Sequence, residues 1–152
     1  MKRAVFPGSF DPITIGHEAI INRALPLFDE IVLAIGVNSN KSYFFTLEER
    51  ISVLEKCFEG QPKISIASYS GLTTEYCKTI KASHILRGLR TAADFEFERT
   101  IALMNKKMAP ELETIFLISE PEHSAISSTV VRDILKNGGD ISDFVPTNFP
   151  KK

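Results

Sequence analysis

Residues 3–17 read RAVFPGSFDPITIGH, and this stretch decides the fold class. The apolar run from Ala4 to Phe6 is typical of a buried strand, and Pro7-Gly8 ends it. The segment from His17 to Phe28 then places apolar residues at helical intervals. The residues between the two elements therefore form a loop that leads from a strand into the amino end of a helix.

The same strand and helix unit repeats along the rest of the chain. The continuous apolar run at 31–35 is typical of a parallel strand that is buried on both faces. Further strands are expected at 63–69, 84–86 and 114–118, and helices at 46–58, 72–80, 92–108 and 130–135. Short connections between alternating strands and helices favour right-handed crossovers. The prediction is an α/β fold in which residues 1–152 form a single domain with a doubly wound, five-stranded parallel sheet.

The composition excludes several classes of protein. The chain has 152 residues, of which 43% are hydrophobic and 24% charged, close to the averages for globular domains. Its net charge of −1 provides no global basic field for nucleic acid or an anionic membrane. The longest strongly apolar run, Ile31 to Val37, is far shorter than the ~20 residues of a membrane helix. We expect a cytoplasmic protein with neither nucleic acid nor a membrane as a partner.

No metal site is expected on the chain itself. Cys57 and Cys77 lack CxxC spacing and fall within helical patterns, which favours free buried thiols. His84 and His123 show no spacing to cysteines or carboxylates that is typical of metal ligands.

Ligands of such sheets bind at the carboxyl ends of the strands, so the loops after strands are the candidate sites. The glycines form neither G-x-G-x-x-G nor G-x-x-x-x-G-K-[ST], which argues against a Rossmann dehydrogenase and a P-loop NTPase. The loop from Gly8 to His17 instead delivers hydroxyls and an imidazole to a helix amino end, which favours anions. Helix capping by Thr14 and His17 accounts for the same residues equally well.

Cations and hydroxyls follow other strands at the same predicted edge. Arg87-Gly88-Leu89-Arg90 places two guanidiniums around a glycine that lets a ligand approach the backbone, although such arginines often form only surface ion pairs. Lys41 follows the second strand and could add a third cation or be solvated. Ser127-Ser128-Thr129 precedes the last helix, where capping needs only one hydroxyl. Arg132 in the first turn of that helix weakly supports a bound anion.

Together, the stretches Gly8 to Pro12, Thr14 to His17, Arg87 to Arg90 and Ile126 to Thr129 resemble the HxGH nucleotidyltransferase superfamily. Within it the chain is similar to the bacterial phosphopantetheine adenylyltransferase family, because Thr14 stands at the first position of the motif. The resemblance implies a Rossmann-like nucleotidyltransferase fold. It also implies transfer of AMP from ATP to 4′-phosphopantetheine, giving dephospho-coenzyme A and pyrophosphate in the penultimate step of coenzyme A biosynthesis.

The resemblance also implies roles for individual residues. His17 is the catalytic residue, which contacts the ATP phosphates while the acceptor phosphate attacks in line without a covalent enzyme intermediate. Phosphopantetheine is held by Ser9, Lys41, Thr73 and Arg87. ATP is held by Ser9, Phe10, His17, Gly88, Leu89, Arg90, Glu98, His123, Ser124, Ala125, Ile126, Ser127, Ser128 and Thr129.

Mg²⁺ is expected to arrive with ATP, since the motifs contain no carboxylate cluster to cage it. The family implies a homohexamer built as a dimer of trimers, in which the apolar stripe from Phe97 to Met108 is either core or interface.

Two positions depart from the family pattern. Ser9 replaces a common threonine, which keeps the hydroxyl and loses a methyl group that restricts the rotamer. His123 stands where an aromatic residue is often found, so packing near the adenine is affected.

Two alternative functions stay open. One is a transferase for nicotinate mononucleotide or glycerol phosphate, although these generally keep a histidine where Thr14 stands. The other is a regulatory module that senses ATP or coenzyme A without turnover.

Overall fold

A computed structural model describes residues 1–150. Strands and helices alternate along this part of the chain, as the periodicity predicts. The elements are β1 (Arg3–Gly8), α1 (Ile15–Ala24), β2 (Glu30–Gly36), α2 (Leu47–Cys57), β3 (Ile64–Tyr69), α3 (Thr73–Thr79), β4 (His84–Leu89), α4 (Ala92–Met108), β5 (Glu113–Ile118) and α5 (Ser128–Lys136), with short 3-10 turns at Leu25–Leu27 and Pro121–His123.

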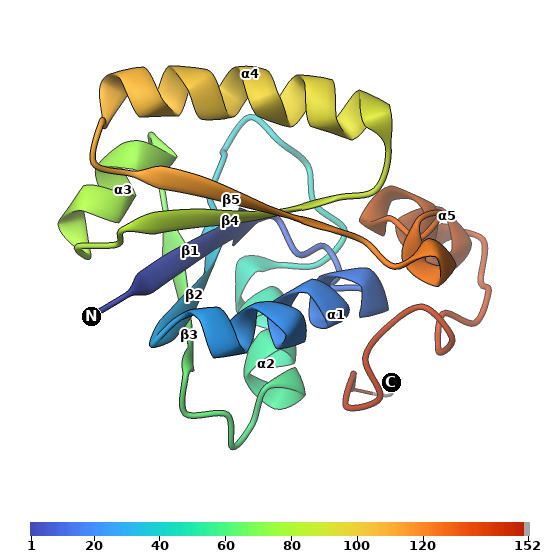
Figure 1. The fold of residues 1–152 in the computed structure, drawn as a ribbon. Helices are drawn as coiled ribbons and strands as arrows, with labels where there is room; N and C mark the ends of the chain where they lie inside the picture. The colour runs from blue at the N-terminus through green and yellow to red at the C-terminus, as the bar shows by residue number, and fades with distance from the viewer. Residues whose placement is uncertain (151–152) are drawn as a thin grey trace.

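The strands form one five-stranded sheet in the order β3-β2-β1-β4-β5, and every neighbouring pair is parallel. Figure 1 shows α1 and α2 on one face of the sheet and α3 and α4 on the other. The chain moves outward from β1 to β3 and then returns to β4, so the strand order reverses between β1 and β4. The predicted doubly wound α/β fold is confirmed, and the loops after β1 and β4 lie at its switch point, where such sheets bind ligands.

The centre of the sheet forms the core of the molecule. Ala4 to Phe6 and Ile31 to Ile35 are all buried, which confirms that the second strand is covered on both faces. Cys57 and Cys77 are free and buried in helices, as expected. Burial, together with the charge of Glu18, raises the pKa of Cys57 to about 12, and burial raises the pKa of Cys77 to about 11. Neither thiol supplies a nucleophile at neutral pH.

Two helices differ in extent from the prediction. The expected helix from His17 to Phe28 ends at Ala24, because Pro26 lacks the amide that would continue it and the chain tightens into a 3-10 turn. It also begins earlier, at Ile15. The last helix begins at Ser128 instead of Val130, since the Ser127 side chain accepts from the Val130 amide and caps the helix.

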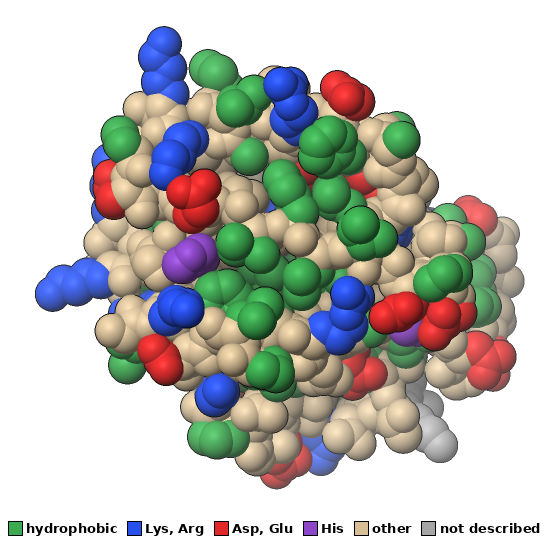
Figure 2. All heavy atoms as spheres, viewed as in Figure 1, with side chains coloured by type: hydrophobic (Ala, Val, Ile, Leu, Met, Phe, Trp, Pro, Cys, Tyr) green, Lys and Arg blue, Asp and Glu red, His purple; other side chains and the backbone are tan. Residues whose placement is uncertain are grey.

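The apolar stripe of α4 does not enter the core of the described chain. No residue of α4 is buried, and Phe97 and Met104 are 68% and 58% exposed. Figure 2 shows hydrophobic side chains gathered on the face of the molecule between α4 and α1. Large exposed apolar patches mark interaction sites, so this face is a candidate contact surface.

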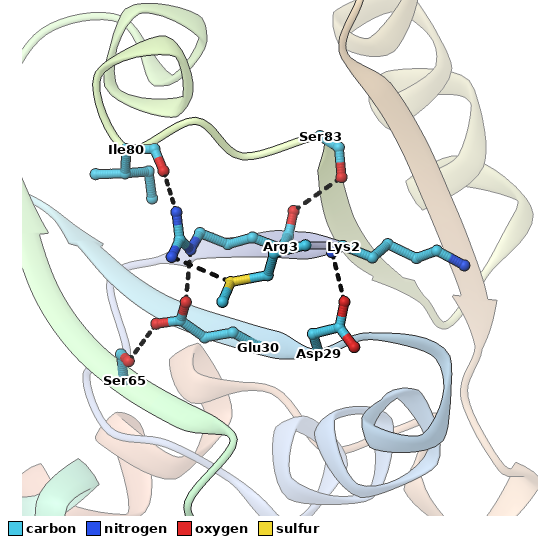
Figure 3. A network of polar contacts seen from close by, with 8 residues as sticks. Lys2, Arg3, Asp29, Glu30, Ser65, Ile80 and Ser83 are labelled. Atoms are coloured by element: carbon cyan, nitrogen blue, oxygen red, sulfur yellow. Dashed lines mark hydrogen bonds and ion pairs between the residues drawn. The ribbon is translucent and has the colours of Figure 1, made fainter.

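A cluster of polar contacts lies where the strands begin, at the edge of the sheet opposite the switch point (Figure 3). Arg3 Nε donates to Glu30 Oε2 at 2.5 Å, and Ser65 Oγ donates to Glu30 Oε1 at 2.5 Å. The Arg3 guanidinium also donates to the carbonyl of Ile80. The hydrogen bonds from Ser65 and Arg3 lower the pKa of Glu30. These contacts join β1, β2, β3 and the end of α3 far from the switch point.

Among residues 1–150, none of the helices has the length and apolar character that crossing a membrane requires.

Candidate active site

The loop after β1 fixes an imidazole at the amino end of α1. Thr14 caps this helix: its Oγ1 accepts from the His17 amide at 3.3 Å, and its own amide donates to His17 Nδ1 at 3.0 Å. Because Nδ1 accepts, the neutral ring carries its proton on Nε2. The rings of Phe10 and Phe6 lie 5.3 and 6.1 Å from the imidazole centroid and restrict its orientation. Capping therefore uses one nitrogen of His17 and leaves the other as a donor.

The electrostatic surroundings keep this imidazole neutral. Burial of the ring, followed by the positive charges of Arg87 and Arg90, lowers the pKa of His17 to about 4. At neutral pH the ring is therefore an uncharged hydrogen-bond donor. The same guanidiniums disfavour its protonation and place two cations beside the ring, and each of them also has a carboxylate partner, Glu98 for Arg87 and Asp94 for Arg90.

Two pockets open at the switch point. The first, here called the histidine pocket, is lined by His17 and Thr14 from the start of α1, by Arg90 after β4 and by residues 126–129 before and within α5. The second, here called the lysine pocket, is lined by Lys41 and Tyr43 after β2, by Thr73 of α3 and by one side of α4. Each pocket thus gathers residues from segments far apart in the sequence.

A shared wall separates the two pockets. Pro7, Gly8, Ser9, Arg87 and Glu98 line both of them. Arg87 makes a bidentate ion pair with Glu98, with Nε to Oε2 at 2.9 Å and Nη2 to Oε1 at 2.7 Å. Its Nη1 donates to the carbonyl of Pro7 at 2.5 Å. The guanidinium is therefore held in a fixed orientation on the boundary between the pockets.

Arg90, in the loop after β4, is held less tightly than Arg87. Arg87 itself lies within β4, because the strand continues to Leu89 and does not end at residue 86 as expected. The Arg90 amide donates to Asp94 Oδ2 at 3.0 Å, and its Nε lies 3.5 Å from the same oxygen. Arg90 is exposed and lines only the histidine pocket. Its guanidinium is available to an anion there.

The hydroxyls at the start of α5 perform structural tasks beside the histidine pocket. Ser127 caps the helix, and Ser128 Oγ donates to the Pro12 carbonyl at 2.8 Å. Arg132 Nη2 donates to Thr129 Oγ1 at 3.2 Å, and Arg132 Nη1 donates to the Asp11 carbonyl at 2.9 Å. The Arg132 guanidinium therefore anchors the loop after β1, which accounts for this cation without a bound anion. Because α5 begins at Ser128, Arg132 lies beyond the first turn, in which it was expected.

Known proteins resemble this chain over most of its length. Residues 5–134 match the family model described as cytidylyltransferase-like. The phosphopantetheine adenylyltransferase of Flavobacterium psychrophilum is 53% identical over 146 residues, which cover 96% of each chain. The enzyme of the same name from Christiangramia forsetii is 51% identical over 152 residues, which cover all of both chains. The chain belongs to the phosphopantetheine adenylyltransferase family.

The fold agrees with that membership. A bifunctional NMN adenylyltransferase/ADP ribose pyrophosphatase from Francisella tularensis has a TM-score of 0.77 at 18% identity, covering 99% of this chain and 46% of that one. At such low identity the likeness concerns the fold alone, which is the Rossmann-like nucleotidyltransferase fold that the motifs predict.

Most of the residues expected from the family motifs line the pockets. All four residues expected for phosphopantetheine lie in the lysine pocket: Ser9, Lys41, Thr73 and Arg87. Those expected for ATP that lie in the histidine pocket are Ser9, Phe10, His17, Gly88, Arg90, Glu98, Ile126, Ser127, Ser128 and Thr129.

Four residues expected for ATP do not line the histidine pocket: Leu89, His123, Ser124 and Ala125. Leu89 is buried on β4, and Ala125 is exposed. His123 lies next to Gly16, which lines the histidine pocket: a Cβ added to Gly16 would be 3.8 Å from the Cβ of His123. The Nδ1 atom of His123 is buried and has no hydrogen-bond partner among the described residues.

The glycine between the two arginines lines the histidine pocket and also has a packing role that the sequence did not indicate. A Cβ on Gly88 would lie 3.1 Å from Ile20 Cγ1 of α1. The missing side chain therefore lets α1 pack closely on the sheet, which brings His17 toward the loop after β4.

Sequence reasoning missed three residues that shape the site. Asp11 and Arg50 are buried polar side chains that contact loop backbone, and Tyr43 lines the lysine pocket. Asp11 lies within the quoted motif, but nothing in its spacing indicates its partners. Arg50 falls in a helical pattern, where an arginine is normally solvated.

Proposed function

We propose that the chain transfers the adenylyl group of ATP to 4′-phosphopantetheine, giving dephospho-coenzyme A and pyrophosphate. The observation that carries this proposal is the pair of pockets that share Ser9, Arg87 and Glu98 as a wall. A transfer between two anionic substrates requires that both be held at once with their reacting atoms adjacent. The names of the relatives identify the pair of substrates.

The division of substrates follows from what lines each pocket. The histidine pocket offers the amino ends of two helices, an imidazole donor and Arg90, which suit a triphosphate. The lysine pocket combines Lys41 with an apolar side formed by Phe97, Ile101 and Ala102 of α4. That combination suits an acceptor with one phosphate and a long, partly apolar arm.

The reaction needs no protein nucleophile. An oxygen of the acceptor phosphate attacks the α-phosphorus of ATP, and the bond from this phosphorus to the bridging oxygen breaks as pyrophosphate leaves. The protein orients the two phosphates and stabilises charge on the transferring group. The Nε2–H of His17 and the guanidiniums of Arg87 and Arg90 supply that stabilisation. Because His17 is neutral, it donates a hydrogen bond without having to release a proton.

We propose that Mg²⁺ enters with ATP, bound by the phosphates and water, and lowers the charge repulsion between the substrates. The two carboxylates in the histidine pocket already have cationic partners, since Glu98 accepts from the Arg87 guanidinium and Asp94 Oδ2 lies 3.5 Å from Arg90 Nε. These paired carboxylates therefore favour Mg²⁺ that is already bound to ATP over Mg²⁺ bound directly by the protein.

We also propose that the chain assembles into the homohexamer, a dimer of trimers, that the family resemblance implies. The exposed apolar side chains of α4 support a contact surface there, and Leu103 and Met108 are 55% and 46% exposed in the single chain. Light scattering coupled to size-exclusion chromatography measures the mass directly. A monomer at micromolar concentration would overturn this part of the proposal.

A pyrophosphate-release assay with a panel of acceptors tests the reaction. We expect release with ATP and phosphopantetheine, and little release with nicotinate mononucleotide or glycerol phosphate. His17→Ala, purified in the same way, controls for contaminating activity. Preference for another acceptor would reassign the substrate. Tight ATP binding without release of pyrophosphate would instead identify a regulatory module.

A further inference from the structure

Arg50 of α2 lies beneath the loop after β1, outside both pocket linings. The residue is 4% exposed. Its Nη1 donates to the carbonyl of Ser9 at 2.9 Å, and its Nε donates to the carbonyl of Thr46 at 3.4 Å. The guanidinium carbon lies 4.1 Å from the centroid of the Tyr43 ring, in cation–π geometry. One side chain thus contacts the loop after β1 and the loop after β2.

This burial is unusual for a charged group. Within residues 1–150, no carboxylate forms an ion pair with Arg50. Removing a guanidinium from water is unfavourable unless it is well paired, and two carbonyls with one aromatic face are weaker partners than a carboxylate. A helix-surface role alone does not require such a group at this position.

A second set of contacts joins the same two loops. The carboxylate of Asp11, which is 2% exposed, accepts from the amide of Phe44 at 2.8 Å and from the amide of Phe45 at 2.8 Å. Asp11 therefore fixes the end of the loop after β2, whereas Arg50 contacts Tyr43, one residue before Phe44. The two contacts together define the separation between Ser9 and the segment that carries Lys41.

We infer that Arg50 is a positioning residue for the acceptor half of the reaction. By contacting the Ser9 carbonyl and the Tyr43 ring together, it sets the width of the lysine pocket between these two walls. The inference rests on the proposed function, because the lysine pocket is the acceptor pocket only if that assignment holds.

The contact should affect the two substrates unequally. Tyr43 and Lys41 line the lysine pocket and are absent from the lining of the histidine pocket. Ser9 lines both, but its neighbours on the histidine side are held independently by Ser128 and by the cap of α1. Loss of the Arg50 contacts therefore widens the acceptor side and leaves most of the nucleotide side in place.

Steady-state kinetics of Arg50→Met and Arg50→Lys test the inference. Arg50→Met removes the charge and all the donors, and we expect about a ten-fold rise in the KM for phosphopantetheine with less than about a two-fold change in the KM for ATP. Arg50→Lys keeps a charge and one flexible donor but loses the planar stacking, so its effect should be intermediate. Calorimetric titration of each substrate alone separates binding from turnover.

Arg3→Met is the matched control. Arg3 is less buried than Arg50 and pairs with Glu30, but it too donates to a backbone carbonyl, that of Ile80, and it lies at the amino edge of the sheet. We expect this variant to lower the thermal unfolding midpoint without a selective change in either KM. If Arg50→Met does not fold, Arg50→Lys supplies the same comparison.

The outcomes separate the two proposals. A wild-type protein that releases no pyrophosphate with phosphopantetheine contradicts the proposed function. A wild-type protein that is active, with Arg50 variants that only lose stability or raise both KM values equally, contradicts the positioning role. A selective rise in the acceptor KM, graded from Arg50→Lys to Arg50→Met, supports it.

Discussion

The histidine and lysine pockets share a wall but differ in how firmly their polar groups are held. In the histidine pocket, Thr14 fixes the imidazole of His17 and Ser128 fixes the adjacent loop. In the lysine pocket, Lys41 is exposed, and no ion pair described within residues 1–150 includes its ammonium group. Preorganised groups stabilise a transition state, whereas a mobile cation contributes mainly to binding. Substitutions on the two sides should therefore change different kinetic constants.

The largest effect is expected on the histidine side. His17→Ala removes a preorganised donor, and we expect kcat to fall by roughly 10²- to 10³-fold with a smaller change in either KM. Steady-state kinetics with saturating ATP and phosphopantetheine measure this loss. His17→Gln retains a polar side chain near Thr14 and tests whether the loss comes from the cap. Normal turnover in His17→Ala would remove the imidazole from the mechanism.

On the lysine side, the expected change is in acceptor affinity. Lys41→Ala removes a cation that can pair with the acceptor phosphate, and we expect the KM for phosphopantetheine to rise about 10-fold or more. The KM for ATP should stay within about two-fold. Lys56→Ala, an exposed lysine on α2, is the matched control. An unchanged acceptor KM together with a large fall in kcat would contradict the contrast between the pockets.

A substitution in the shared wall should change the kinetic constants for both substrates. Glu98→Gln keeps the shape of the side chain but weakens its bidentate pairing with Arg87, so the guanidinium loses its fixed orientation. We expect kcat/KM for both substrates to fall by about five-fold, which is less than for removal of a reacting group. Initial rates with each substrate varied in turn measure this. An effect confined to one substrate would place Glu98 in one pocket only.

The sequence predicts the fold and the pocket loops because both depend on local patterns. Apolar runs such as Ile31 to Ile35 mark buried strands, and parallel strands bring their carboxyl ends to one edge. The roles of Asp11 and Arg50 could not be predicted, because their partners are backbone groups 33 and 41 residues away. The packing role of Gly88 could not be predicted either, because it depends on the close approach of Ile20 from α1.

The smallest expected effect concerns the charge state of His17. Its pKa of about 4 lies below the usual 6.5. Between pH 4 and pH 6.5, the imidazole is therefore protonated in the unfolded chain and neutral in the folded chain. The contribution of His17 to folding stability is therefore complete above pH 6.5 and is lost as the pH falls toward 4. NMR titration of the imidazole resonances measures this pKa directly. Arg90→Met should raise it only modestly, because burial and Arg87 are the larger causes, and Lys41→Met should not change it. A wild-type value near 6.5 would show that the ring is solvated and that its neutrality is not built into the histidine pocket.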